Sequence, residues 1–247
     1  MTQQSLGLIG IGAFGKLAAK HLAPHFDLVL HDAAANNADL ATKIGARTGD
    51  LSEAAGCDIV VLAVPIQKFK QVLTDIAPWL KAGALVLDVA SVKIMPTQVM
   101  LEVLPENVAL VGTHPMFGPQ SGKNGIAGLN LVLCDVRGER GAEVAQFCTE
   151  KLNLKVSLAT PEEHDREAAY VQGLTHLLAK IVISLDLPPM RFPTRTYELM
   201  QQMIEMIRYD SDDLFRAITR ENPFAEAAQK SFFDAAKTVE DKLSKNN

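Results

Sequence analysis

A glycine-rich turn between a short strand and a helix places the strongest constraint on the fold of this chain. Leu6 to Ile9 is an apolar run typical of a buried strand, and it leads directly into Gly10-Ile11-Gly12-Ala13-Phe14-Gly15. Residues 16–23 have helical composition and end before Pro24. Glycines at this spacing allow a tight turn, close helix–strand packing and the approach of a pyrophosphate, which a helix N-terminus attracts. The pattern predicts a dinucleotide-binding unit whose cofactor residues are Gly10, Gly12, Ala13, Phe14 and Gly15.

An acidic residue follows the second predicted strand. This strand covers residues 26–30 and runs into His31-Asp32, and Asp32 lies seventeen positions beyond Gly15. At about this distance an acidic side chain binds the ribose diol of the adenosine. The alternative for Asp32 is a solvated turn residue. Residues 33–37 contain no arginine that could hold a 2′-phosphate, which favours NAD over NADP as the cofactor.

Short apolar runs alternate with helical segments up to about residue 158. The predicted strands cover residues 57–64, 84–88, 108–111, 130–133 and 154–157, and the predicted helices cover residues 66–80, a segment near Pro96, and residues 140–152. Apart from Asp58 the run at 57–64 is apolar, as expected for a strand that helices cover on both faces. The alternation predicts an α/β fold, a doubly wound, mostly parallel Rossmann-type sheet over residues 1–158.

Only helices are predicted after Thr160. The sequence Thr160-Pro161-Glu162-Glu163 has the form of a capping box with proline at the first helical position, and the helix should reach about Asp186. Further helices are expected over residues 195–207, after Asp210-Ser211 and from Asn222-Pro223. Residues 159–247 would thus form a smaller all-helical domain. Because so small a core buries its apolar faces better against a second copy, we expect a homodimer.

Composition argues against several classes of partner. The formal net charge of −5 disfavours nucleic acid and anionic membranes, which need clustered Lys and Arg. The longest apolar run, residues 59–66, is far shorter than the ~20 residues that span a bilayer, and the start Met-Thr-Gln-Gln-Ser lacks the parts of a signal peptide. Cys57, Cys134 and Cys148 show no Cys-x-x-Cys spacing, so buried reduced thiols are expected rather than disulfides or metal ligands. We therefore expect a cytoplasmic protein.

A histidine follows the predicted strand at 108–111, within the sequence Gly112-Thr113-His114-Pro115-Met116-Phe117-Gly118-Pro119. Open α/β sheets bind their ligands at the carboxyl ends of the strands, and a neutral imidazole can accept a proton near pH 7. His114 is therefore a candidate general base, and the alternative is a histidine satisfied in a tight turn. The glycine-rich loop at 116–129 would either cover a site at this edge or be an inert surface loop.

One stripe of the long predicted helix carries polar residues. At the helical period Asp165, Ala169, Gln172 and His176 fall within about 60° of one another. Polar residues flanked by apolar ones either face solvent or line a pocket. We expect His176 to line a pocket, with solvent exposure as the alternative.

These motifs together resemble the prephenate/arogenate dehydrogenase family of tyrosine biosynthesis, over nearly the whole chain. The resemblance rests on the glycine-rich turn, on Asp88-Val89-Ala90-Ser91-Val92-Lys93, on the segment from His114 to Pro119, and on His164-Asp165 followed by Gln172 and His176. It implies a nucleotide-binding domain, a helical dimerisation domain and an active site between them. The implied reaction is the oxidative decarboxylation of arogenate or prephenate, with hydride transfer to NAD.

The resemblance also implies roles for residues of the first domain. His114 would bond to the ring hydroxyl of the substrate and accept its proton. Ser91 would orient His114 and the substrate by hydrogen bonding. Val64 and Pro65 would pack beside the nicotinamide ribose. No metal is implied.

In the helical domain the resemblance assigns Gln172 and His176 to the substrate. Many bacterial relatives carry an arginine that binds a substrate carboxylate, and Arg195 and Arg208 are the candidates here. Asp210 matches a position at which an acidic residue goes with a preference for arogenate, whose ammonium it can pair with. The alternative for Asp210 is the N-cap of the helix that follows.

Two other classes of function compete with this interpretation. Another NAD(P)-dependent dehydrogenase, of the 3-hydroxyacid or imine type, would be expected to place a lysine or a second acid in the long helix, where this chain has Gln172 and His176. A catalytically inactive dinucleotide-binding regulator would not require Ser91 and His114 together.

Overall fold

The structure is a computed structural model that describes residues 4–34 and 37–245. The chain divides into two compact units, unit 1 (Met1–Glu162) and unit 2 (Glu163–Asn247). This division lies close to the boundary expected after residue 158. The assignment of cofactor binding to the first domain and of substrate binding and dimerisation to the second remains a prediction.

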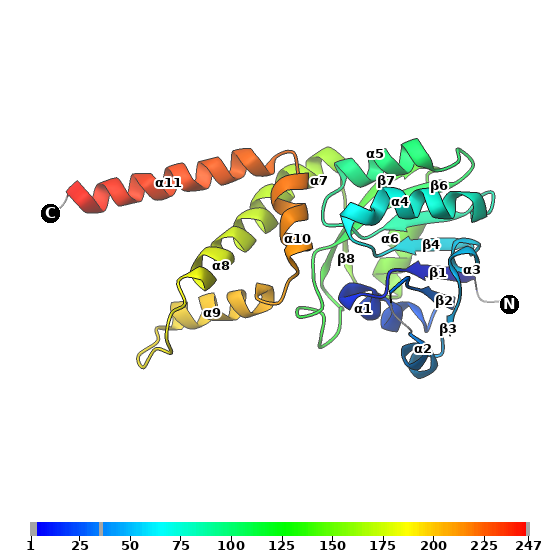
Figure 1. Cartoon of the computed structure of the whole chain (residues 1–247), viewed down its shortest axis with the longest axis horizontal. Coiled ribbons are helices and arrows are strands. Elements are labelled where there is room, and N and C mark those ends of the chain that lie inside the picture. Colours follow the sequence, from blue (N-terminus) through cyan, green and yellow to red (C-terminus); the bar gives the residue numbers. More distant parts are fainter. Residues whose placement is uncertain (1–3, 35–36, 246–247) are drawn as a thin grey trace. The chain divides into compact units, whose positions relative to one another are not determined.

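Unit 1 is built on one eight-stranded sheet (Figure 1). Its strands are β1 (Ser5–Ile9), β2 (Asp27–His31), β3 (Arg47–Thr48), β4 (Ile59–Leu62), β5 (Leu85–Asp88), β6 (Ala109–Pro115), β7 (Asn130–Arg137) and β8 (Lys155–Leu158). The strand order is β3-β2-β1-β4-β5-β6-β7-β8. Strands β6 and β7 pair antiparallel, and the other neighbouring strands pair parallel. The predicted doubly wound, mostly parallel sheet is confirmed.

Helices connect these strands in the alternation that the sequence predicts. The helices of unit 1 are α1 (Ala13–Leu22), α2 (Ala38–Ile44), α3 (Leu51–Ala55), α4 (Ile66–Ile76) with a 3₁₀ turn at Ala77–Trp79, α5 (Ile94–Val103) and α6 (Gly141–Glu150). The short elements β3, α2 and α3 were not predicted. The sequence does contain a signal for α3, because Asp50 and Glu53 form a reciprocal capping box at its start.

The strands in the middle of the sheet bury almost all of their side chains, whereas β3 and β8 at its two ends have no buried residue. Every residue of β4 and β5 is buried, as expected for strands in the middle of a parallel sheet. Cys57, Cys134 and Cys148 are buried and unbonded to one another, which confirms the expectation for the thiols. Burial raises the pKa of the Cys148 thiol to about 11, so this thiol stays protonated at neutral pH.

Strand β6 is longer than the sequence predicts. It continues beyond Val111 because β7 pairs with it as far as His114, opposite Val132, and Pro115, opposite Leu131. The prediction ended the strand at Val111 because glycine and proline are unfavourable in strand interiors, but a proline at the end of a strand is tolerated. The alternative of His114 in a tight turn is therefore wrong, since His114 lies within a strand.

The regular elements of unit 2 within the described residues are all helices. It contains most of α7 (Pro161–Ala168), a π-helical segment (Ala169–Leu174), α8 (Thr175–Ser184), α9 (Arg195–Ile207), α10 (Asp212–Arg216), a second π-helical segment (Ala217–Glu221) and α11 (Ala225–Lys245). The long predicted helix is thus interrupted by a wide turn at residues 169–174. A small core forms where α8 and α9 pack through Ala179, Ile204 and Ile207.

None of the helices traced through residues 4–34 and 37–245 combines the length and the apolar character that crossing a membrane requires.

Candidate functional site

The three glycines of the turn between β1 and α1 differ in their surroundings. Gly10 has a φ of +96°, and a Cβ there would lie 2.5 Å from the carbonyl oxygen of Ala63. A Cβ on Gly15 would lie 2.0 Å from the carbonyl oxygen of Gly10. Gly12 is exposed, and a Cβ on it would meet no atom within 4 Å. The fold therefore needs Gly10 and Gly15 as glycines, whereas Gly12 leaves open space at the start of α1.

This open space fits an anion. Gly12 is the N-cap of α1, and within the described part of the chain no side chain caps this helix end. The N–H groups of the first turn, which includes Ala13 and Phe14, therefore lack the acceptor that a capping side chain supplies elsewhere. A phosphate would supply that acceptor, and the dipole of α1 would favour its charge. The turn is thus suited to the pyrophosphate of a dinucleotide.

The carboxylate of Asp32 is bonded to the same turn. Its Oδ2 accepts a hydrogen bond from the backbone N–H of Ile11 (2.7 Å), and its Oδ1 accepts one from Ala34 (2.8 Å). The first bond connects the end of β2 to the glycine-rich turn, which a solvated turn residue would not do. A role at the adenosine ribose remains a prediction. Of the arginine-free segment 33–37, residues 35 and 36 lie outside the described residues.

Val64 and Pro65 follow β4 at the position where the strand order reverses. Strand β1 lies between β2 and β4. The chain therefore first adds β2 and β3 on one side of β1 and then adds β4 and β5 on the other side. Ligands of open α/β sheets bind in the crevice at such a switch point. Val64 is half-buried and Pro65 is exposed. Contact with a nicotinamide ribose remains a prediction for both residues.

Ser91 and His114 lie at the carboxyl ends of neighbouring strands. Ser91 is half-buried and follows β5, and His114, which is 3% exposed, is the penultimate residue of β6. Because the parallel register places Asp88 opposite Gly112, the chain beyond each strand reaches the same edge of the sheet. Unit 1 therefore brings the two candidate catalytic residues to the edge that also carries the glycine-rich turn.

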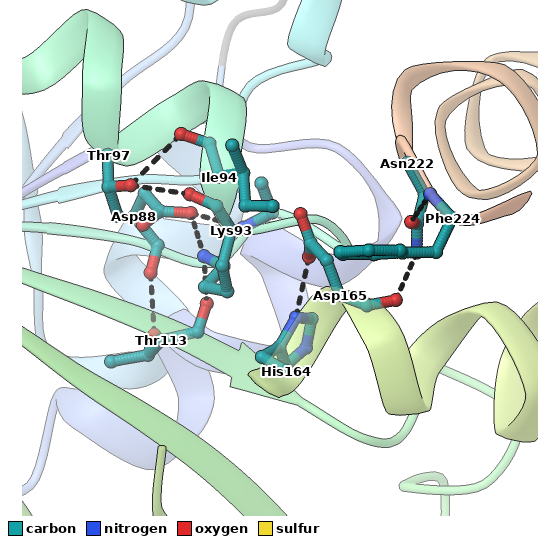
Figure 2. A network of polar contacts seen from close by, with 10 residues as sticks. Asp88, Lys93, Ile94, Thr97, Thr113, His164, Asp165, Asn222 and Phe224 are labelled. Atoms are coloured by element: carbon teal, nitrogen blue, oxygen red, sulfur yellow. Dashed lines mark hydrogen bonds and ion pairs between the residues drawn. The ribbon is translucent and has the colours of Figure 1, made fainter. Parts of the chain in front are cut away.

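A buried ion pair lies beneath these residues. The Lys93 ammonium contacts Oδ1 of Asp88, and both side chains are fully buried. The same ammonium donates a hydrogen bond to the backbone carbonyl of Thr113 (2.6 Å), and the Thr113 hydroxyl donates one to the Asp88 carbonyl (2.6 Å). Figure 2 shows the three side chains converging. From the sequence, Asp88 and Lys93 are recognised only as part of a motif. A lysine in an apolar segment five residues after a strand-end aspartate was the available signal.

Unit 2 brings three of the predicted substrate residues together. Nε2 of His176 lies 3.1 Å from Oδ2 of Asp210, and Nδ1 of His176 lies 2.9 Å from the Gln172 carbonyl oxygen. The Gln172 side-chain oxygen is buried and has no hydrogen-bond partner among the described residues. The alternative of a solvent-exposed stripe is wrong, because His176 is 8% exposed. The N-cap alternative for Asp210 is also wrong, since Ser211 caps α10.

Arg195 lies apart from this group within unit 2. It begins α9, whose thirteen residues make the helix roughly 20 Å long, whereas Asp210 follows the other end. The Arg195 guanidinium is exposed and pairs with Glu198 at 3.1 Å. Arg208 lies at the Asp210 end of α9 and pairs with Glu205 at 2.7 Å. The position of Arg208 suits a shared site with Asp210 better, and the carboxylate-binding role of either arginine remains a prediction.

His164 and Asp165, which the sequence places in a motif without a separate role, form a buried contact. Nδ1 of His164 lies 2.8 Å from Oδ1 of Asp165, and the Asp165 carbonyl accepts a hydrogen bond from the Asn222 amide (2.7 Å). Asn222 also accepts from the backbone N–H of Phe224 (2.9 Å), just before α11 (Figure 2). These bonds tie α7 to the residues directly before α11 inside unit 2.

Comparison with known proteins gives consistent matches. Residues 17–148 match the family described as prephenate dehydrogenase, nucleotide-binding domain. The chain is 30% identical to arogenate dehydrogenase 1 of Arabidopsis thaliana, over 96% of this chain and 39% of the relative. It is 31% identical to a probable arogenate/prephenate dehydrogenase of Methanocaldococcus jannaschii, over 74% of this chain and 43% of the relative. The chain thus spans only about two fifths of these two relatives.

Solved structures share the fold. A prephenate dehydrogenase from Aquifex aeolicus, crystallised with hydroxyphenyl propionate and NAD+, superposes with a TM-score of 0.79 at 18% identity, over 100% of this chain and 92% of the other. Arogenate dehydrogenase from Synechocystis superposes with a TM-score of 0.69 at 20% identity, over 97% and 91%.

The strand order, the glycine-rich turn beside the switch point and the carboxylate after β2 define a Rossmann-type dinucleotide-binding protein. The matched residues make the assignment more specific, since they include Asp32, Ser91 and His114. The chain belongs to the prephenate dehydrogenase family.

The different surroundings of Gly12 and Gly15 lead to a prediction. Gly15→Ala should lower the melting temperature by about 5 to 15 °C, because the new Cβ meets a backbone oxygen that cannot move aside. Gly12→Ala is the matched control, and it should shift the melting temperature by no more than about 3 °C, because its Cβ enters open space. Thermal unfolding followed by circular dichroism compares the two. Equal losses would contradict this description of the turn.

Proposed function

We propose that the protein catalyses the oxidative decarboxylation of arogenate or prephenate with NAD+ as hydride acceptor. The main support for this reaction is that Ser91 and His114 lie at the edge of the sheet that holds the glycine-rich turn. Family membership supports the same reaction, because relatives over most of this chain are named arogenate dehydrogenases. A regulator that only binds a dinucleotide would not need a buried histidine beside a serine at that edge.

The cofactor site is proposed from unit 1. The turn at Gly12 would hold the pyrophosphate, Asp32 the adenosine ribose, and Val64 and Pro65 the nicotinamide ribose. Asp32 favours NAD over NADP, because its carboxylate would repel a 2′-phosphate. When bound, NAD+ would accept the hydride from the hydroxyl-bearing ring carbon of the substrate.

The proposed chemistry asks little of the protein beyond positioning and one proton transfer. His114 would accept the proton of the ring hydroxyl while the C–H electron pair leaves as hydride. The electrons of the bond to the departing carboxylate then complete the aromatic ring, with carbon dioxide as the leaving group. Ser91 would orient His114 and the hydroxyl, and Gln172 and His176 would bind the rest of the substrate. No step requires a metal.

Of the two substrates, arogenate suits Asp210 better. The Asp210 side chain is 19% exposed, and its carboxylate contacts His176. A carboxylate in this position can pair with the ammonium that arogenate carries and prephenate lacks. The substrate preference is therefore proposed to depend on Asp210.

We also propose a homodimer formed through unit 2. Large apolar side chains are exposed along α8, the following loop and α9, and these are Leu178, Leu185, Leu187, Met190, Phe192, Leu199 and Met206. The small core of unit 2 leaves this surface uncovered, and exposed apolar patches on a stable protein mark contact surfaces.

The activity prediction concerns His114. The purified protein should reduce NAD+ with arogenate or prephenate, and His114→Asn should lower kcat by about 10²–10⁴ with little change in KM for NAD+, because the variant loses a general base. Gly12→Ala is the matched contrast and should raise KM for NAD+. Absorbance at 340 nm measures both. Flat traces with both substrates, from folded protein that binds NAD+, would favour the regulator instead.

The specificity prediction concerns Asp210. Asp210→Asn should lower the ratio of kcat/KM for arogenate over prephenate by about tenfold, because the ammonium loses its partner. Asp212→Asn is the control, because the Asp212 side chain is fully exposed nearby. Steady-state kinetics with both substrates gives the ratios. An unchanged ratio in Asp210→Asn would remove this residue from substrate selection.

The oligomer prediction uses sedimentation equilibrium at micromolar concentration. The chain of 26.8 kDa should sediment as a species of about 54 kDa, because the apolar surface of unit 2 would be buried between two copies. Phe192→Asp together with Leu199→Asp should give the monomer. Trp79→Asp, at an exposed apolar side chain of unit 1, should leave the dimer intact. A monomeric wild-type protein would contradict the proposed dimer.

A further inference from the structure

The fully buried pair Asp88–Lys93 contacts the backbone on both sides of the candidate catalytic edge of unit 1. Two charges without solvent exposure are unusual, because each loses its hydration on folding. Replacing such a pair with apolar residues of similar size frequently leaves stability unchanged or improves it. A contribution to stability alone therefore does not explain why this pair is present.

Lys93 contacts the backbone directly before His114. The Lys93 ammonium donates to the carbonyl of Thr113 at 2.6 Å. That carbonyl belongs to the peptide bond between Thr113 and His114, and a peptide bond is planar. The Thr113 carbonyl and the nitrogen and Cα of His114 lie in this plane, so a hydrogen bond that holds the carbonyl also restrains those two atoms. Lys93 thus restrains the backbone from which the imidazole extends.

Asp88 contacts the backbone directly before Ser91. Asp88 Oδ1 accepts a hydrogen bond from the backbone N–H of Ala90 (2.8 Å), which closes a side-chain turn directly before Ser91. The Thr113 hydroxyl closes the network by donating to the Asp88 carbonyl at 2.6 Å. The hydrogen bonds of Asp88, Lys93 and Thr113, all three of which Figure 2 labels, therefore connect the turn that carries Ser91 to the strand that carries His114.

We propose that Asp88 and Lys93 are positioning residues that hold Ser91 and His114 in a fixed relation to each other. The inference rests on the proposed function of those two residues. Misplacing a catalytic group by about 1 Å can cost 10²-fold in rate, so a rigid connection between the two residues has a direct catalytic value. The pair does not itself touch the substrate.

The test is the double variant Asp88→Asn/Lys93→Met. It removes both charges and replaces the side chains with neutral ones of similar size, so no uncompensated charge remains in the interior. Its melting temperature should stay within about 5 °C of wild type, because neither member of the pair remains charged in the interior. The single variant Lys93→Met should be less stable than the double variant, because it leaves the Asp88 charge buried without its partner. Its kcat should fall about 10- to 100-fold, with KM for NAD+ unchanged. A double variant with wild-type kcat would overturn the proposal.

A second ion pair in unit 1, half-exposed where Asp88–Lys93 is buried, provides the control. Lys81 and Asp58 pair at 2.8 Å next to the amino ends of β5 and β4, at the edge of the same sheet opposite to Ser91 and His114. Asp58→Asn/Lys81→Met makes the same chemical change and should leave kcat unchanged. A kcat loss equal to that of the first double variant would overturn the proposal, because it would show a general effect of removing sheet-edge charges.

A readout without turnover separates this inference from the proposed function. The imidazole resonances of His114, assigned by their loss in His114→Asn, can be followed by NMR. They should shift in Asp88→Asn/Lys93→Met and stay in place in Asp58→Asn/Lys81→Met. Unchanged His114 resonances in the first double variant would overturn the positioning role. A wild-type protein inactive with both substrates would contradict the proposed function alone.

Discussion

The contact between the Lys93 ammonium and the Asp88 carboxylate is the interaction on which the edge of the sheet depends. Both groups are withdrawn from water, so each requires the other. Residue 112 packs tightly against them, since a Cβ there would lie 3.3 Å from Asp88 Oδ2 and 3.2 Å from a methyl group of Thr97, and a glycine at this position avoids both contacts. Uncharged residues in place of Asp88 and Lys93 would avoid the cost of burying two charges. The Thr113 carbonyl would then lack its charged hydrogen-bond donor.

The parallel sheet explains why candidate groups from distant parts of the sequence occur together in unit 1. The glycine-rich turn follows β1, Asp32 follows β2, Val64 follows β4 and Ser91 follows β5, so all four lie beyond the carboxyl ends of parallel strands. His114 joins them because β6 also runs parallel to β5. The antiparallel strand β7 then holds His114 by pairing opposite it.

The sheet, its order of elements and the positions of the cofactor turn could be predicted from local patterns, because strand and helix periodicity and glycine spacing are local properties. The extension of β6 through His114 could not, because it depends on pairing with β7. The contact between His176 and Asp210 joins residues 34 positions apart, so the helical period of the sequence cannot predict it. The wide turn at residues 169–174 also escaped prediction, because a uniform helical period cannot represent an inserted residue.

The central claim is that the imidazole of His114, held at this edge, takes the hydroxyl proton of the substrate. The most direct test is the dependence of kcat on pH in wild type and in His114→Asn. We expect wild-type kcat to rise with pH as a general base loses its proton, and this rise to be absent from the variant. The same rise in His114→Asn would contradict the claim, because another group would then be the base.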